Sequence, residues 1–88
     1  MLLEMLKVDL GITVNAYDAR LTQCITTAQE NIIAEGVSDL DTTNISDANL
    51  VIMYAAWMWR RRDTMDAMPR MLRWCLNNRV MGVKARDS

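Results

Sequence analysis

Apolar residues between positions 16 and 35 recur with the period of an α-helix. At 100° per residue, the apolar side chains that fall within an arc of roughly 100° are Tyr17, Leu21, Cys24, Ile25, Ala28 and Ile32. The opposite side carries Thr, Gln and Glu, and Gly36 follows at a position that suits the left-handed backbone after a helix end. The pattern predicts an amphipathic helix with one buried stripe. Ile33 lies off the stripe and is either covered by the next loop or in contact with a partner.

Two shorter helices are predicted near the beginning and the end of the chain. Residues 1–10 are predicted to form a short helix that ends before Gly11. The last helix begins in the turn that contains Pro69, whose missing N–H costs nothing there, and is expected to stop at Gly82. One face of this last helix carries Leu72, Cys75, Leu76, Arg79 and Val80.

A central helix is predicted over residues 47–62. The polar loop 37–46 precedes it, and either Asn44 or Ser46 caps its start. No segment alternates between apolar and polar residues over a strand length. The predicted fold class is all-α, a small helical bundle of three main helices plus a short N-terminal helix. We expect a single domain over residues 1–82 and a basic, flexible tail over residues 83–88.

The central helix is apolar on all sides. Its stretch LVIMYAAWMW (residues 50–59) makes about 15 Å of helix, half of the ~30 Å that a bilayer core requires, so a membrane span is rejected. Such a helix must be surrounded by other parts of the protein. Leu50, Tyr54 and Trp57 share one face and are expected in the core. Ile52 and Trp59 lie nearly opposite, and because 88 residues can hardly cover every side, we expect this back face to contact another subunit.

Three arginines follow the apolar stretch. Arg60, Arg61 and Arg62 step by 100°, so they are expected to fan around the helix end instead of forming a stripe. Cations in a last turn complement the helix dipole. A phosphate-binding patch would require the fold to bring these side chains together again.

Charge is divided unevenly along the chain. The net charge is −1, but residues 1–50 carry two basic and eight acidic side chains, whereas residues 51–88 carry eight basic and three acidic ones. Two interpretations stay open, neutralisation within the chain and stacking of subunits with an acidic side against a basic side. A small DNA-binding regulator that uses the basic half is the alternative function, although a pI of about 5.2 argues against strong phosphate binding.

Several kinds of chemistry lack the residues that they need. The chain has no His, which excludes a conventional Ser–His or Cys–His nucleophile. Its two cysteines are 51 positions apart and form no zinc motif. The three glycines are too far apart for a phosphate-binding loop. We expect no enzyme activity, no metal and no cofactor.

The succession of three sequence blocks resembles a known family. These blocks are LLEMLKVDLGI with YDARLTQCITTAQENII, then DANLVIMYAAWMWRRRD, and then MPRMLRWCLNNRVM. Together they cover roughly residues 2–81 and are similar to the small head–tail connector (head-completion, adaptor) proteins of tailed bacteriophages and prophages. The chain differs from longer relatives in its short loops between helices, so the resemblance leaves open whether it has the channel or docking loops that some relatives use.

The resemblance implies a structural role. Such subunits form a ring homo-oligomer beneath the portal protein, bind a downstream completion or tail protein on the other side, and surround a channel through which DNA passes without being recognised. The location implied is the head–tail junction of the virion, and the host cytoplasm during assembly. The candidate subunit and portal interface consists of Ile33, Ile52, Trp59, Arg60, Arg61, Arg62, Arg70, Arg73, Trp74, Lys84 and Arg86.

Overall fold

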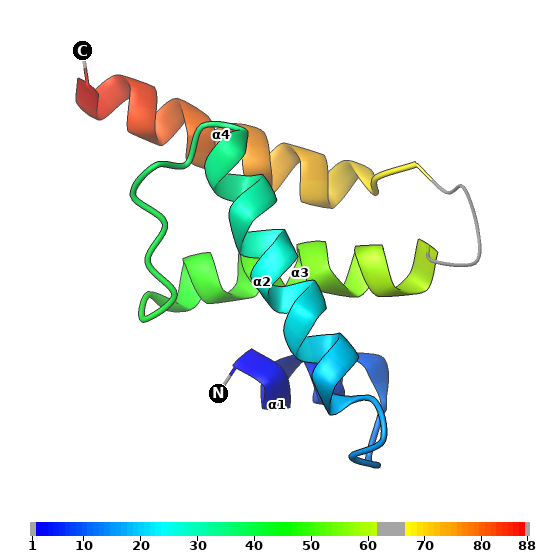
Figure 1. Ribbon diagram of the computed structural model, residues 1–88. Helices are drawn as coiled ribbons and strands as arrows, with labels where there is room; N and C mark the ends of the chain where they lie inside the picture. Colours follow the sequence, from blue (N-terminus) through cyan, green and yellow to red (C-terminus); the bar gives the residue numbers. More distant parts are fainter. Residues whose placement is uncertain (1, 62–66, 88) are drawn as a thin grey trace.

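Four α-helices form the part of the chain that the computed structural model describes, residues 2–61 and 67–87 (Figure 1). They are α1 (Leu2–Leu10), α2 (Asp18–Ala34), α3 (Ile45–Arg60) and α4 (Arg70–Asp87). These described residues contain no strand. The prediction of an all-α bundle with three main helices and a short leading one is therefore confirmed.

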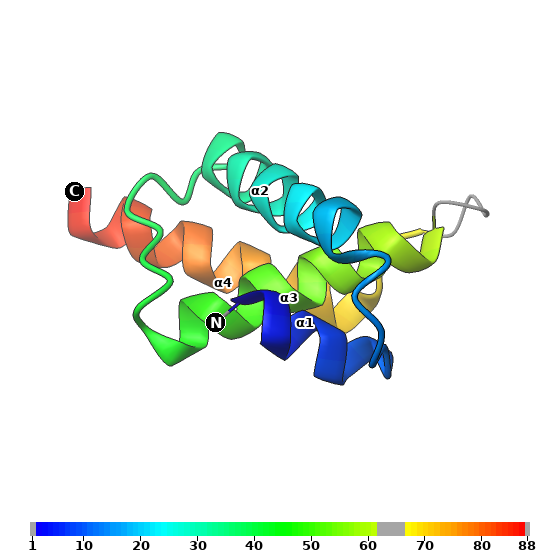
Figure 2. The ribbon, with the colours of Figure 1, turned by 60° about the horizontal axis from the view of Figure 1, so that its bottom comes forward.

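Helix α3 is the centre of the fold and contacts each of the other three helices. It lies between α1 and α4, while α2 crosses over it on one side (Figure 1 and Figure 2). The resulting domain is a thin plate, with extents of 45 × 29 × 17 Å. Most of α3 is buried by the other helices, but Met53, Trp57 and Met58 stay partly exposed, which becomes important for the candidate site.

The buried stripe of α2 packs against α3 and α1. Leu21, Ile25, Ala28 and Ile32 are buried as the helical period predicts. They meet a core of apolar side chains that includes Leu6, Val51, Ala55, Leu72 and Leu76. Burial of each Leu or Ile side chain stabilises the fold by roughly 1.5–3 kcal/mol. Since the four helices share this core, no helix buries its apolar face alone.

Asn44 is the residue that caps α3. Its backbone is extended (φ −82°, ψ 129°), and its side-chain oxygen accepts a hydrogen bond of 2.9 Å from the N–H of Ser46. This geometry satisfies one of the free donors in the first turn. The choice between Asn44 and Ser46 that the sequence leaves open is thus decided in favour of Asn44.

Gly36 allows α2 to end against α4. Its φ of +128° is unfavourable for any residue with a side chain. A Cβ atom there would lie only 3.0 Å from Cγ1 of Val80 on α4. The predicted role of Gly36 after the helix end is confirmed, and the same glycine also permits the close approach of two helices.

Helix α4 is longer than the sequence pattern predicts. It continues through Gly82 to Asp87, so the expected helix end at Gly82 is wrong, and residues 83–87 are helical. A glycine inside a helix costs about 1 kcal/mol relative to alanine. Val83 is 7% exposed, and its burial contributes roughly 1.5–3 kcal/mol, which outweighs that cost.

None of the helices, over the described residues, is long and apolar enough to cross a membrane.

Candidate interaction surface

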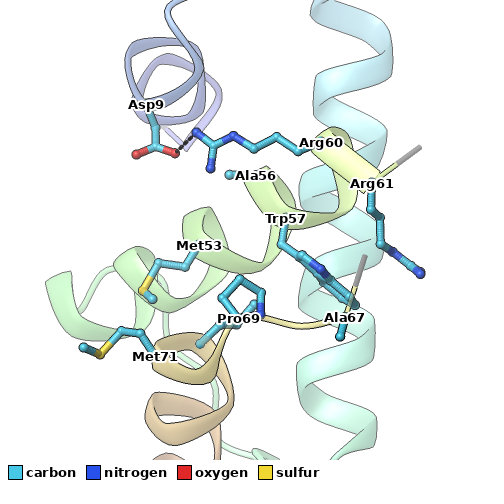
Figure 3. Close-up of a pocket in the computed structure, with 10 residues that line it drawn as sticks. Asp9, Met53, Ala56, Trp57, Arg60, Arg61, Ala67, Pro69 and Met71 are labelled. Atoms are coloured by element: carbon cyan, nitrogen blue, oxygen red, sulfur yellow. Dashed lines mark ion pairs between the residues drawn. The ribbon is translucent and has the colours of Figure 1, made fainter. Parts of the chain in front are cut away.

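A mostly apolar hollow of about 510 Å³ opens over α3, between α1 and the beginning of α4 (Figure 3). We call it the α3 groove. Its apolar lining consists of Met53, Ala56, Trp57, Ala67, Pro69, Met71 and Leu72, and its charged rim of Asp9, Arg60 and Arg61. The Met53 and Met71 side chains extend toward the same side of the groove, one from α3 and one from α4 (Figure 3).

The groove lies on the side of α3 that α2 leaves uncovered. Residues of α2 line a surface hollow together with Met58 and Trp59, so α2 borders α3 at these two positions. Met53 is turned from both by roughly 120–140° around the helix axis. The open face of an all-round apolar helix, which the sequence predicts, therefore exists, but it is centred on Met53 and Trp57.

The predicted interface residues Ile52 and Trp59 are buried within the chain, at 6% and 9% exposed. The expectation that they form a back face for a neighbouring subunit is wrong. Trp59 meets Tyr17 edge to face, with ring centroids 5.8 Å apart. Helical period alone indicates which residues share a face, but it does not indicate which faces the other helices of the same chain cover.

Trp57 holds an unusual position in the groove. Its ring meets Tyr54 edge to face, with centroids 5.5 Å apart. The guanidinium carbon of Arg61 lies 4.4 Å from the centroid of the same indole ring. The indole Nε1 is buried and finds no hydrogen-bond acceptor among the described residues. Trp57, which the sequence assigns to the core, is only partly buried as a residue.

The arginines at the end of α3 diverge as predicted. Arg60 reaches toward α1, where its Nη2 lies 3.7 Å from Oδ2 of Asp9 (Figure 3). Arg61 turns back over Trp57 instead. Both guanidinium groups stand at the rim of the α3 groove. Arg62 lies outside the described residues.

A row of large apolar side chains runs along the outer face of α4. Met71, Trp74 and Met81 are 61%, 63% and 66% exposed. At 100° per residue these three positions fall within an arc of roughly 80°. Met71 also lines the α3 groove, so the row begins at the groove and continues along the helix. Of these residues, the sequence singles out only Trp74.

The remaining predicted interface residues differ in their exposure and in their contacts. Ile33 is 48% exposed on α2, so the loop that follows does not fully cover it. Arg70 and Lys84 are exposed on α4. Nη1 of Arg73 donates a hydrogen bond of 2.9 Å to Oε1 of Glu35. The side chain of Arg86 lies outside the described part of the structure.

Arg79 and Asp47 form a partly buried ion pair between α4 and α3. Nε of Arg79 donates to Oδ1 of Asp47 at 2.8 Å, and Nη2 donates to Oδ2 at 3.0 Å. Arg79 also pairs with Asp39 at 3.0 Å. Hydrogen bonding to Asp47, with the charge of that carboxylate, raises the pKa of the Arg79 guanidinium. The sequence signal for this pair is the position of Arg79 on the apolar face of the last helix.

Part of the uneven charge of the two chain halves is neutralised inside the molecule. Ion pairs join the acidic first half to the basic second half through Asp9–Arg60, Glu35–Arg73, Asp39–Arg79 and Asp47–Arg79. Of the two open interpretations, the structure favours neutralisation within the chain. Those pairs also occupy guanidinium groups that a phosphate-binding surface would need.

The residues that the structure describes contain no group of three or more His, Cys, Asp or Glu side chains that could hold a metal ion. Cys24 and Cys75 are not joined by a disulfide and are of intermediate exposure. The α3 groove offers apolar side chains and two guanidinium groups for contact with a partner.

Comparison of the chain with known protein families, with curated proteins and with solved structures gave no match.

Proposed function

We propose that this chain is a structural adaptor of a tailed bacteriophage or prophage, a head–tail connector subunit that forms a ring beneath the portal protein. The ring joins the portal to the next completion or tail protein and surrounds the channel through which DNA passes. The role is one of binding without turnover. The resemblance of the three sequence blocks suggests this function.

The observation that carries the proposal is the apolar row Met71, Trp74 and Met81 on α4. Monomeric proteins rarely expose extended apolar patches, and such patches mark interaction sites. Trp and Met are also enriched at protein–protein interfaces. Met71 belongs to both the row and the α3 groove, so the two features meet at this residue.

A ring of identical subunits needs two different surfaces on each subunit, because a heterologous contact closes by rotation. The apolar row supplies one of them. Affinity in such an assembly comes from many repeated contacts, so each single contact can be weak. The pI of about 5.2 suits a protein that surrounds DNA without holding it.

The experiment is co-expression with the portal protein encoded in the same genome. The two proteins are purified together, and the complex is analysed by light scattering and electron microscopy. We expect co-elution and a ring of small subunits attached to the portal. Trp74→Ser should abolish co-elution while the circular dichroism and melting temperature of the isolated chain stay the same.

The matched control is Val14→Ser, which removes an exposed apolar residue from the segment between α1 and α2. This variant should assemble normally. The proposal is wrong if the wild-type chain neither binds the portal nor associates with itself, or if Trp74→Ser assembles as well as wild type. A gene neighbourhood without portal and major capsid genes would also contradict it.

A further inference from the structure

A second surface with exposed apolar side chains lies on α1, which α3 separates from the apolar row of α4 (Figure 1). It is a hollow of about 450 Å³, which we call the α1 hollow, and the apolar side chains that α1 contributes to it are Met5 and Val8. Val8 is 82% exposed, the highest value among the large apolar side chains of the described residues. The chain therefore presents apolar side chains to its surroundings on two different helices.

Acidic side chains border the α1 hollow. Glu4 and Asp9 are the charged residues that line it. Lys7 of the same helix is turned toward α2, where its Nζ donates to Oδ1 of Asp18 at 2.8 Å. Because Glu4 precedes Val8 by one helical turn, a carboxylate and the exposed apolar side chain are neighbours along α1.

Basic side chains border the apolar row of α4 in the same arrangement. Arg70 precedes Trp74 by one helical turn, and Arg70 and Lys84 are both exposed. Side by side, α4 of one copy and α1 of another can therefore bring Trp74 to Val8 and, one turn earlier, Arg70 to Glu4.

The charge of the whole C-terminal segment has the same sign. Residues 61–88 carry seven basic and three acidic side chains, a count that includes every residue of the segment 62–66. Arg73 and Arg79 bind three acidic side chains from the first half of the chain. The balance stays positive when these three are added.

Self-pairing of either surface is a poorer arrangement. Two α4 helices in contact would bring the Arg70 and Lys84 side chains of one copy near those of the other, and like charges in contact are unfavourable. Two α1 helices in contact would do the same with Glu4 and Asp9. The two different surfaces suit each other better than either suits itself.

We propose that the apolar row of one copy packs into the α1 hollow of the next copy. Trp74 enters the hollow beside Val8, and Arg70 lies against Glu4 of the neighbour. Because the two surfaces differ, the contact is heterologous and repeats from copy to copy until rotation closes a ring. The inference rests on the proposed function and supplies the second surface that its ring requires.

The test uses the full chain and two variants that each place a cation on one of the two surfaces. Val8→Lys blocks the α1 hollow, Trp74→Lys blocks the row, and each variant keeps its other surface intact. Sedimentation velocity at millimolar protein measures the mass of the particles. We expect wild type to associate and each variant alone to stay monomeric. An equimolar mixture of the variants should form a one-to-one pair and nothing larger, because only the two intact surfaces can meet.

The matched control is Val14→Lys, which adds the same charge at an exposed apolar position between α1 and α2. It should associate as wild type does, and circular dichroism should be the same for all of these proteins. The proposal is overturned if wild type stays monomeric, if Val8→Lys associates as strongly as wild type, or if the mixture of the two variants stays monomeric.

Failure of this proposal can be told apart from failure of the proposed function. If Val8→Lys still forms a ring on the portal, the α1 hollow is not the ring contact, and the proposed function stands. If the mixed variants form the pair but the wild-type chain does not bind the portal, the contact between copies is correct and the virion role is wrong.

Discussion

Arg79 of α4 holds Asp47 of α3 through two parallel hydrogen bonds, at 2.8 and 3.0 Å. Asp47 is only 4% exposed, and its Oδ2 also accepts the backbone N–H of Asp41 at 3.0 Å. The pair therefore joins two helices and the loop between α2 and α3. Its geometry is that of a bidentate Arg–carboxylate contact, the strongest form of charged hydrogen bond.

Arg79→Met should destabilise the fold by about 2–3 kcal/mol, because it leaves the Asp47 carboxylate buried without its partner. Urea unfolding followed by circular dichroism measures the change. The double variant with Asp47→Leu should recover most of the loss, since two apolar side chains replace the pair. If the double variant is less stable than Arg79→Met alone, the ion pair itself, and not its unpaired half, carries the stability.

Trp59→Ala should destabilise the fold by about 3–5 kcal/mol, the usual cost of removing a large core side chain. The reason is that Trp59 is buried and packs edge to face on Tyr17. Trp74→Ala is the matched comparison, and as an exposed substitution it should change stability by about 0.5 kcal/mol or less. Thermal unfolding of the two variants measures both changes in stability. Equal stabilities would place Trp59 at the surface after all.

Gly82→Ala should stabilise the fold by roughly 0.5–1 kcal/mol, because alanine has the higher helix propensity. Nothing lies within 4 Å of the added Cβ, and the φ of Gly82 is not positive. Gly36→Ala is the opposite case. Its φ of +128° and the 3.0 Å approach to Val80 predict a loss of about 1–3 kcal/mol. In denaturant unfolding, a loss of stability for Gly82→Ala would contradict the helical path through Gly82, and a gain for Gly36→Ala would contradict the strain at Gly36.

The Asp41 carboxyl should titrate below its ordinary pKa of 3.8. The main cause is the hydrogen bond from the Thr43 hydroxyl, followed by the one from the Thr43 backbone N–H at 3.0 Å. A carboxyl whose pKa is lowered by folding contributes stability above its unfolded pKa, and this contribution is lost as the pH falls through the folded pKa.

NMR titration of the Asp41 side-chain carbon measures this pKa directly. Thr43→Val removes the hydroxyl donor and keeps the shape, so the pKa of Asp41 should rise toward 3.8. An Asp41 pKa that is the same in both proteins would show that the Thr43 hydroxyl does not act on the carboxyl.

The helices of the fold can be predicted from the local pattern of apolar and polar residues, as α2 demonstrates. The stripe from Leu21 to Ile32 has one apolar face, and the structure buries that face. The end of α4 was not predictable in the same way. Gly82 is an ordinary stop signal, and only the burial of Val83 by the other helices makes continuation favourable.

The local pattern of apolar and polar residues is not sufficient to predict where the candidate site lies. A small chain cannot cover every side of an apolar helix. The prediction that α3 has an uncovered face is correct, although the predicted residues are not the ones on that face. Which face stays open depends on where α2 crosses, and that is a property of the whole fold. The sequence therefore directs attention to Ile52 and Trp59, whereas the structure leaves the face of Met53 and Trp57 partly exposed.

Helix α4 connects the α3 groove to the far end of the plate. Its first turns carry Met71 and Leu72 at the groove, and Val83 is buried near its other end. The helix is about 27 Å long at 1.5 Å per residue and has no break. Helix α4 therefore links the groove and the buried Val83 through continuous helical backbone, without an intervening loop.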